Sequence, residues 1–330
     1  MSTSRRGSAL LAVLWLSAAL SAIAFSLAST VRGETERAST AADGTRAYYL
    51  ASGSIDRAIL WIFWGMQGFN NPDGSPRFYK APMPRLAFQY ASGTAMVEVI
   101  PEAGKLNVNS ATAQDLERIM LSLGADPDRA RSVTLAIMQA RSPGPPQPVL
   151  ALSPAPPSSF RPPGASFQEL EEILLVPGMT PELFYGHYDT DASSGRLIPR
   201  GGLRDCLTTH GAGDRVDVNT APPELLASLG IPASAVTEIV NRRTARPIKS
   251  MDEIAPLIQG APGASKLNIG GNSIWTLRAT ARMKLPDGRL GDLRRTVSAT
   301  VKFLDPGKWD PPYHILRWYD DAWSPAGTAF

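Results

Sequence analysis

The chain has 330 residues, of which 43% are hydrophobic and 19% are charged, with a formal net charge of +3. This composition belongs to a folded protein with a core and excludes a chain that is disordered throughout. The single cysteine, Cys206, excludes an internal disulfide and a multi-cysteine zinc site. Residues 102–266 hold 15 Lys and Arg against 18 Asp and Glu, so the middle of the chain is acidic and the remainder is basic.

The first notable segment is an apolar stretch near the amino terminus. No charged residue occurs from Ser8 to Val31. As a helix with a rise of about 1.5 Å per residue, this stretch would be roughly 36 Å long, enough to cross the core of a bilayer. Residues 1–7 precede it as a short leader, and Arg5 and Arg6 favour a cytoplasmic location for that end. The sequence therefore predicts a membrane-spanning segment at 8–31, with the rest of the chain outside the cytoplasm.

A cleavable secretory signal is the alternative for this segment, because a basic start, an apolar run and small residues such as those at 22–24 or 27–28 also describe such a signal. Topology alone leaves the two readings open. The sequence beyond Val31 favours a retained helix: an alanine-rich polar stretch is followed by apolar residues at helical spacing over 47–62. We therefore expect one long helix, with an amphipathic extension at 32–65 and a kink or break at Asp43-Gly44.

Alternating strand patterns appear in two blocks that are far apart in the chain. The first lies within 66–101 and the second within 268–330, where Pro286-Asp287-Gly288 marks a turn. A helix followed by antiparallel strands predicts an α+β fold in which the sheet packs on the helix. Because the two blocks must pair to complete one sheet, residues 102–267 are expected to form an inserted all-α domain.

The insertion contains an internal repeat. Each copy has a Leu/Val-x-Val-Asn motif, ending at Asn109 and at Asn219, followed by a helical pattern and a second helix that ends in arginine. Both asparagines are predicted to be helix N-caps, which contribute about 1 kcal/mol each. The copies are expected at 102–183 and 214–267, with a proline-rich exposed loop at 143–163. A third helix is expected to open with a capping box at Ser166 and at Ser250.

A short basic leader that ends in Gly7, an immediate apolar helix and an amphipathic extension resemble type IV pilin-class proteins. The resemblance implies that prepilin peptidase cuts after Gly7 and methylates the new terminus, Ser8. The sequence departs from the usual pilin pattern at two positions. Ser8 stands where many pilins have phenylalanine, and Ala12, at mature position five, stands where nearly all have glutamate. Within this class, a missing glutamate is characteristic of the minor pseudopilin called protein K of the type II secretion system (general secretion pathway).

Segments 104–109 and 218–223 match two signatures of protein K, whose head carries tandem SAM-like repeats (units similar to the sterile alpha motif). The resemblance implies a non-enzymatic subunit at the tip of the pseudopilus that supports export of folded proteins across the outer membrane. It further implies a single-pass inner-membrane protein with a cytoplasmic amino terminus and a periplasmic head. Its expected partners are minor pseudopilins I and J, prepilin peptidase and the inner-membrane secretion platform. The helix would contact its neighbours through small residues, namely Ala18, Ala19, Ala22 and Ala24.

A DNA-binding helix-hairpin-helix protein of a competence-type pilus is the strongest rival function. Such hairpins have a second glycine whose backbone amide approaches a phosphate. Here the corresponding positions hold Asp126, Thr180 and Pro232, and the region is net acidic. Because a carboxylate repels phosphate and proline has no amide hydrogen, no nucleic-acid partner is expected.

An enzyme or a metal protein is also disfavoured by the motifs. His187, His210 and His314 are isolated and accompany no recognised nucleophile or metal motif, so no catalytic residue is assigned. Asp189-Thr-Asp191 begins like a calcium loop, but Arg200 stands where the loop needs a bidentate glutamate. We assign neither a metal ligand nor a cofactor. Calcium stays an open expectation that comes only from the resemblance.

Overall fold

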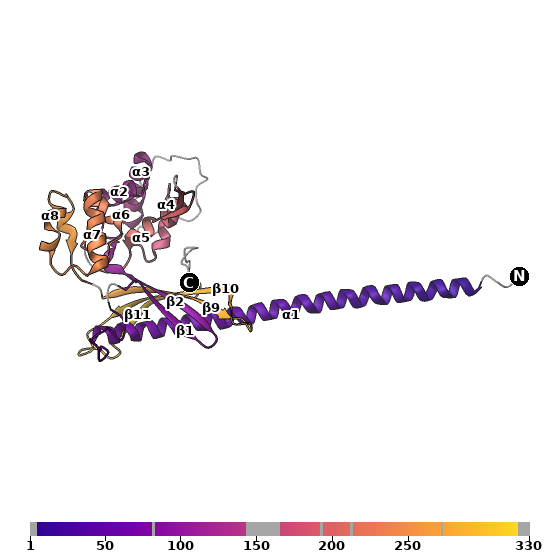
Figure 1. The fold of residues 1–330 in the computed structure, drawn as a ribbon. Helices are drawn as coiled ribbons and strands as arrows, with labels where there is room; N and C mark the ends of the chain where they lie inside the picture. The colour runs from indigo at the N-terminus through magenta and orange to yellow at the C-terminus, as the bar shows by residue number, and fades with distance from the viewer. Residues whose placement is uncertain are drawn as a thin grey trace.

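The computed structural model describes residues 5–80, 83–142, 166–191, 194–211, 214–271 and 273–322, so the predicted proline-rich loop at 143–163 lies outside the described residues. A single long helix runs away from the rest of the chain, and a sheet and a group of short helices lie around its far end (Figure 1). The α+β fold class predicted from the sequence is confirmed, with a helix packed on an antiparallel sheet.

Helix α1 extends from Arg5 to Met66. Its large apolar side chains from Leu10 to Val31 are each more than half exposed in the described part of the chain. In the described part of the chain, α1 is the one helix long and apolar enough to cross a membrane. Farther along, alanine and isoleucine side chains recur every three or four residues and bury one face of the helix; they are Ala47, Ala51, Ile55, Ala58, Ile59 and Ile62.

The predicted kink at Asp43-Gly44 is wrong, because α1 continues through it without a break. Gly44 instead lies beneath Arg295 of the sheet, and a Cβ atom there would be 3.3 Å from a guanidinium nitrogen of Arg295. The glycine therefore allows an arginine to pack against the helix backbone, and the helix tolerates it because tertiary contacts stabilise both sides.

The sheet has five strands in the order β1-β2-β9-β10-β11, and all neighbours are antiparallel. Residues 77–80 and 83–84, which lie within the first predicted strand block, are not strand. In strand β2, Val97 pairs with Ala279 of β9, so the intervening insertion lies between two adjacent strands of one sheet. The strands are β1 (Arg85–Tyr90), β2 (Gly93–Pro101), β9 (Ile274–Lys284), β10 (Leu290–Phe303) and β11 (Tyr313–Tyr319).

One core forms between α1 and the sheet, because alternate residues of each strand point toward the helix. Leu277 and Ala279 of β9 are fully buried there. At the flank next to β1, the ring of Trp61 meets that of Phe88 edge-on at 5.2 Å, and the guanidinium of Arg57 lies 4.6 Å from the centre of the Phe88 ring. This aromatic and cationic packing fixes the edge strand on the helix.

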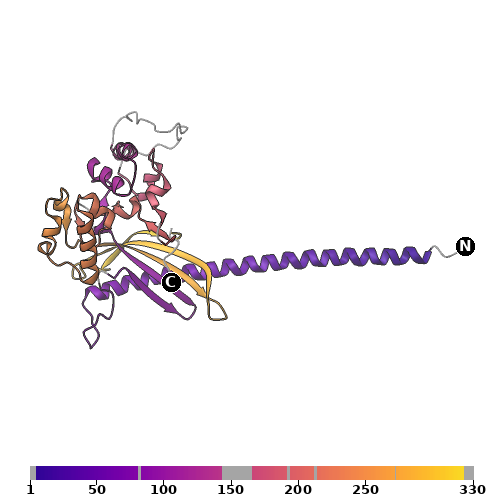
Figure 2. The ribbon, with the colours of Figure 1, turned by 45° about the horizontal axis from the view of Figure 1, so that its top comes forward.

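The inserted domain has a second, separate core and stands above the sheet in both views (Figures 1 and 2). It is not all-α as expected, because it contains two parallel two-residue ladders and one hairpin. Its elements are η1 (Glu102–Gly104), β3 (Leu106–Asn107), α2 (Ala113–Ser122), α3 (Pro127–Arg141), η2 (Leu170–Leu175), α4 (Pro181–Tyr185), β4 (His187–Thr190), β5 (Leu197–Arg200), α5 (Leu203–Cys206), β6 (Leu207–Thr208), β7 (Val216–Asp217), α6 (Pro223–Ser228), α7 (Ala233–Ala245), η3 (Met251–Glu253), α8 (Ala255–Ile258), η4 (Ala264–Lys266) and β8 (Leu267–Asn268).

The two copies of the repeat share one plan. Each begins with a short strand, continues through two α-helices and a 3-10 helix, and closes when a second short strand pairs in parallel with the first: β3 with β6, and β7 with β8. The first copy therefore ends at Thr208 rather than at the predicted 183, because its closing strand follows the β4–β5 hairpin.

Candidate functional site

The repeated asparagines do not cap helices, which corrects the role expected for them. Asn109 accepts a hydrogen bond from the backbone N–H of Phe167 (2.8 Å) and donates one to the carbonyl of the same residue (2.9 Å). Asn219 makes the same pair of bonds with Ile248, at 2.8 Å and 2.9 Å. Each side-chain amide thus pairs with a backbone segment as a neighbouring strand would, and it ties the start of its copy to the segment before the 3-10 helix.

Two arginines complete this arrangement, and their role was not predicted although the sequence places both at helix ends. Arg141 donates to the carbonyls of Val108 and Ala111. Arg243 donates to the carbonyls of Val218 (2.9 Å) and Ala221 (2.6 Å). Burial lowers the pKa of both guanidinium groups from the ordinary arginine value, although neither arginine is fully buried. We call each Asn–Arg pair, Asn109 with Arg141 and Asn219 with Arg243, a clamp.

Helix capping follows the prediction at one place and departs from it at others. Thr112 is the N-cap of α2, where it forms a capping box with Asp115. The box expected at Ser250 is present and uses Glu253, but Ser166 forms no such box. In the first copy, Glu172 accepts from the backbone N–H groups of residues 168 and 169 in its place.

The two copies also contact each other directly. Gly104 lies so close to Thr220 that a Cβ atom at position 104 would be 2.6 Å from the hydroxyl and from the carbonyl carbon of Thr220. Lys266 of the second copy forms an ion pair with Asp115 of the first. Burial alone would raise the pKa of Asp115, but hydrogen bonds from Lys266 and Thr112 outweigh it and lower the pKa. These contacts join the two copies into one domain with a shared core.

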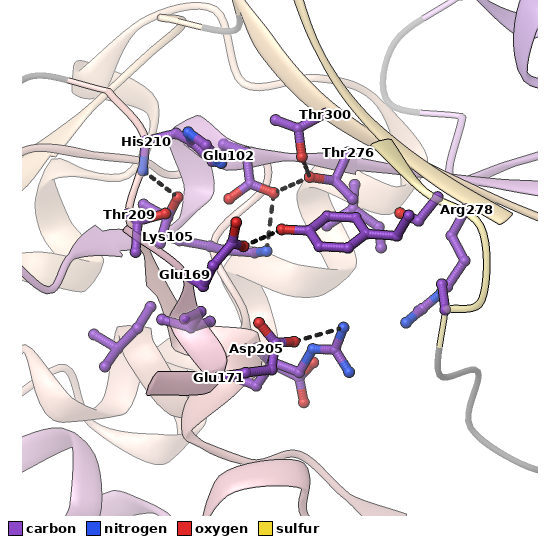
Figure 3. Close-up of a pocket in the computed structure, with 18 of the residues that line it drawn as sticks. Glu102, Lys105, Glu169, Glu171, Asp205, Thr209, His210, Thr276, Arg278 and Thr300 are labelled. Atoms are coloured by element: carbon purple, nitrogen blue, oxygen red, sulfur yellow. Dashed lines mark hydrogen bonds and ion pairs between the residues drawn. The ribbon is translucent and has the colours of Figure 1, made fainter. Parts of the chain in front are cut away.

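A polar cleft of about 570 Å³ separates the inserted domain from the outer face of the sheet, and we call it the joint cleft. Glu102 lies at its floor, and Figure 3 shows Lys105 and Thr276 pointing toward it. Glu102 accepts from the Thr276 hydroxyl (2.6 Å) and from the Lys105 ammonium (3.1 Å), while Thr276 is 3.1 Å from the hydroxyl of Thr300. Burial raises the pKa of Glu102, but Lys105 and the hydroxyl donors outweigh this effect, so the pKa lies below its usual value.

Other charged groups of the joint cleft are paired in the same way. Glu169 accepts from the phenol of Tyr319 and forms an ion pair with Arg317 at 3.2 Å, which links the first copy to β11. Burial and Glu169 raise the pKa of Tyr319. Burial lowers the pKa of His210, which lines the cleft. Because Glu102 and Glu169 bond to cations and hydroxyls that include residues of the sheet, we interpret the cleft as a joint that holds the inserted domain on the sheet.

The residues predicted for processing lie on α1. Gly7 and Ser8 fall in its first turns, and Ala12 lies one turn farther on, exposed like the apolar side chains around it. Exposure of Ala12 alone neither supports nor opposes its predicted role, which stays a prediction. His187 lies on β4 and His314 on β11, on elements different from the segment of His210.

At two of the three hairpins considered for DNA binding, side chains of the chain itself accept hydrogen bonds from backbone amides. Asp126 accepts from the backbone N–H groups of Asp128 (3.0 Å) and Arg129 (3.3 Å), and Thr180 caps α4 by accepting from Leu183. The amides at these two hairpins are therefore already hydrogen-bonded by side chains of the chain itself.

The segment considered for calcium is an antiparallel hairpin, in which β4 pairs with β5. Its Asp189 carboxylate lies 2.8 Å from Arg200 and 3.2 Å from His187. Arg200 and His187 thus lie against the carboxylate that a calcium ion would need, and the described residues contain no cluster of three or more metal-binding side chains.

Neither models of protein families nor curated proteins match this sequence significantly. Among solved structures, the fold is similar to a chain in the crystal structure of the GspK-GspI-GspJ complex from the enterotoxigenic Escherichia coli Type 2 Secretion System. The TM-score is 0.59 at 13% sequence identity, and the match covers 87% of this chain and 100% of that chain. The long helix, the antiparallel sheet and the helical parts together thus have the α+β fold of a subunit from that secretion complex.

Proposed function

We propose that this protein is a GspK-like minor pseudopilin of a type II secretion system. The observation that carries the proposal is the structural match, which covers the whole of the other chain and 87% of this one. A match of that extent includes parts of the inserted domain as well as the helix and sheet. In this role the protein is a structural subunit rather than an enzyme, and it supports export of folded proteins across the outer membrane.

The exposed half of α1 supports a membrane-anchored subunit. Apolar side chains from Leu10 to Val31 face solvent in the isolated chain, which costs free energy unless lipid or neighbouring helices cover them. We propose that α1 spans the inner membrane once, with a cytoplasmic amino terminus and a periplasmic head. Prepilin peptidase would act between Gly7 and Ser8 and methylate Ser8, and the secretion platform would hold the mature chain. A cleaved secretory signal predicts instead that the mature protein lacks this segment.

Ala12 supports a position at the tip of the pseudopilus. A glutamate within the apolar segment costs several kcal/mol unless it has a partner. In a helical filament of pilin-class subunits, that partner is proposed to be the amino terminus of the neighbour nearer the tip. A subunit with no such neighbour would bear the cost alone, and Ala12 avoids it. The inserted domain, which we propose contains two SAM-like units, also favours the tip because its size hinders stacking beneath another subunit.

Minor pseudopilins I and J are the proposed neighbours, and the exposed face of α1 is the proposed contact. The test is cysteine cross-linking along α1, for example at Ala18 and Ala22, in cells that make all the pseudopilins. Cross-links to the minor pseudopilins are expected. A ladder of self-cross-linked species would show a repeating shaft subunit and would contradict the tip position. Intact-mass analysis of the same membrane-extracted protein should give a chain that begins at Ser8.

A further inference from the structure

The end of the sheet nearest the apolar half of α1 is positively charged. Contacts with α1 show how the strands are oriented along the helix. Near the end of α1, the backbone of Tyr79 bonds to that of Trp61, and the Tyr79 ring meets the ring of Trp275 at the start of β9. Closer to the amino terminus, Arg295 lies against Gly44. Strand β9 therefore runs back along α1 toward the amino terminus, and the β9–β10 hairpin extends past the sheet on that side. Figures 1 and 2 both show this end of the sheet on the side from which α1 emerges.

The hairpin and the strand ends beside it, residues 282–295, carry five cationic side chains against two carboxylates. We call this segment the basic hairpin. Two of its cations are partly neutralised, since Arg289 lies 2.6 Å from Asp287 and Arg282 lies 3.8 Å from Asp292. The exposed cations are Lys284, Arg289, Arg294 and Arg295. The inserted domain on the opposite side of the sheet has the opposite sign, with a net excess of three carboxylates over residues 102–266.

The distance from the basic hairpin to the apolar segment is short. Gly44 is thirteen residues beyond Val31, which corresponds to about 20 Å of helix. Arg295, which lies against Gly44, pairs with Ala281 of β9. Asp287 at the hairpin turn is six residues beyond Ala281, and six residues of strand span at most about 20 Å. The turn also exposes an apolar side chain, since Leu285 is 40% exposed. An exposed leucine flanked by Lys284 and Arg289 is suited to a lipid headgroup region.

We propose that the basic hairpin binds the anionic surface of the membrane that α1 crosses, and so holds the head in one orientation before assembly. The inference rests on the proposed membrane anchoring of α1. Each Lys or Arg near an anionic surface is attracted to it, and the attraction decays within a Debye length of the surface and weakens with added salt. The same surface repels the acidic inserted domain. Attraction of the basic hairpin and repulsion of the inserted domain therefore favour the same orientation of the head.

The test uses the full chain reconstituted in lipid nanodiscs, with a fluorophore on a cysteine introduced by Pro286→Cys at the exposed hairpin turn. The native Cys206 is buried and burial raises its pKa, so it reacts slowly with a thiol reagent. A quencher on the lipid headgroups reports proximity. Quenching should be at least about twofold stronger in bilayers that contain phosphatidylglycerol than in pure phosphatidylcholine, and about 0.5 M NaCl should remove the difference.

Two matched double variants each reverse two charges, one variant at each end of the sheet. Lys284→Glu with Arg289→Glu should abolish the lipid-dependent quenching. Lys302→Glu with Lys308→Glu, at the far end of β10 and the loop that follows, should leave it unchanged because both side chains are exposed and distant from the hairpin. Equal quenching in the two lipids, or equal loss in both double variants, would overturn the inference while leaving the membrane anchor intact. Failure of the chain to enter nanodiscs would overturn the proposed anchor as well.

Discussion

The two copies of the inserted repeat differ in length and agree in their clamps. The first copy spans residues 102–208 and contains the β4–β5 hairpin, whereas the second closes within residues 214–268. Yet Asn109 and Asn219 make the same two bonds, and Arg141 and Arg243 reach the same two carbonyl positions of their copies. The comparison teaches that each copy is defined by a few side chains that satisfy its backbone groups. The length of chain between those side chains can vary.

The largest effect is expected from removing a clamp arginine. Arg243→Met deletes two charge-assisted hydrogen bonds and leaves two carbonyls of the Val218–Ala221 turn without a donor, so unfolding should become easier by about 3 kcal/mol. Arg141→Met should have an effect of similar size in the first copy. Chemical denaturation followed by circular dichroism measures both.

Arg129→Met is the matched control, because Arg129 is exposed on the same helix as Arg141. Its effect should be within about 0.5 kcal/mol of zero, as for surface substitutions in general. Equal losses at positions 129 and 141 would show that the clamp does not stabilise the copy.

A smaller effect is expected from the clamp asparagines. Asn219→Ala removes a donor and an acceptor from the backbone of Ile248 and should cost about 2 kcal/mol. Asn219→Asp keeps the acceptor but places a carboxylate against the Ile248 carbonyl, so it should not restore the stability. If the asparagines acted as helix caps, aspartate would substitute well, since it caps as effectively as asparagine. Recovery with aspartate would therefore contradict the clamp.

The smallest effect concerns the pH dependence of the joint cleft. Glu102 has a folded-state pKa below its unfolded value of 4.5, so its contribution to stability is present above that pH and is lost as the pH falls through the lower folded pKa. The free energy of unfolding should therefore fall on acidification below about pH 4.5. In Glu102→Gln this fall should be shallower when both proteins are compared at pH 5 and pH 3. An identical slope would show that Glu102 is not held ionised in the cleft.

Local patterns made most of the fold predictable. The period of the apolar residues placed α1, and alternation placed the strands of both blocks, because each depends on one face that is buried. The duplicated Val-Asn motifs marked the repeat because they occur at the same place in both copies. The kink at Gly44 was a wrong prediction because glycine is equally suited to a close contact, and its partner Arg295 is distant in sequence.

The site was less predictable, since its contacts join residues that no local pattern relates. Asn109 bonds to a residue 58 positions away, and Glu102 bonds to Thr276 across 174 positions. Sequence reasoning assigned the asparagines to the nearest helix start, whereas Thr112 occupies the cap of α2. The arginines at the ends of α3 and α7 were the available signal for the clamps, because a cation at the same place in two copies indicates a shared acceptor.

Membership of a minor-pseudopilin complex is tested most directly by co-expression with the I and J subunits encoded in the same genome. After detergent extraction, affinity purification through a tag on this chain should recover both subunits in one species of defined mass. Recovery of this chain alone, or only as a self-associated ladder, would contradict the account.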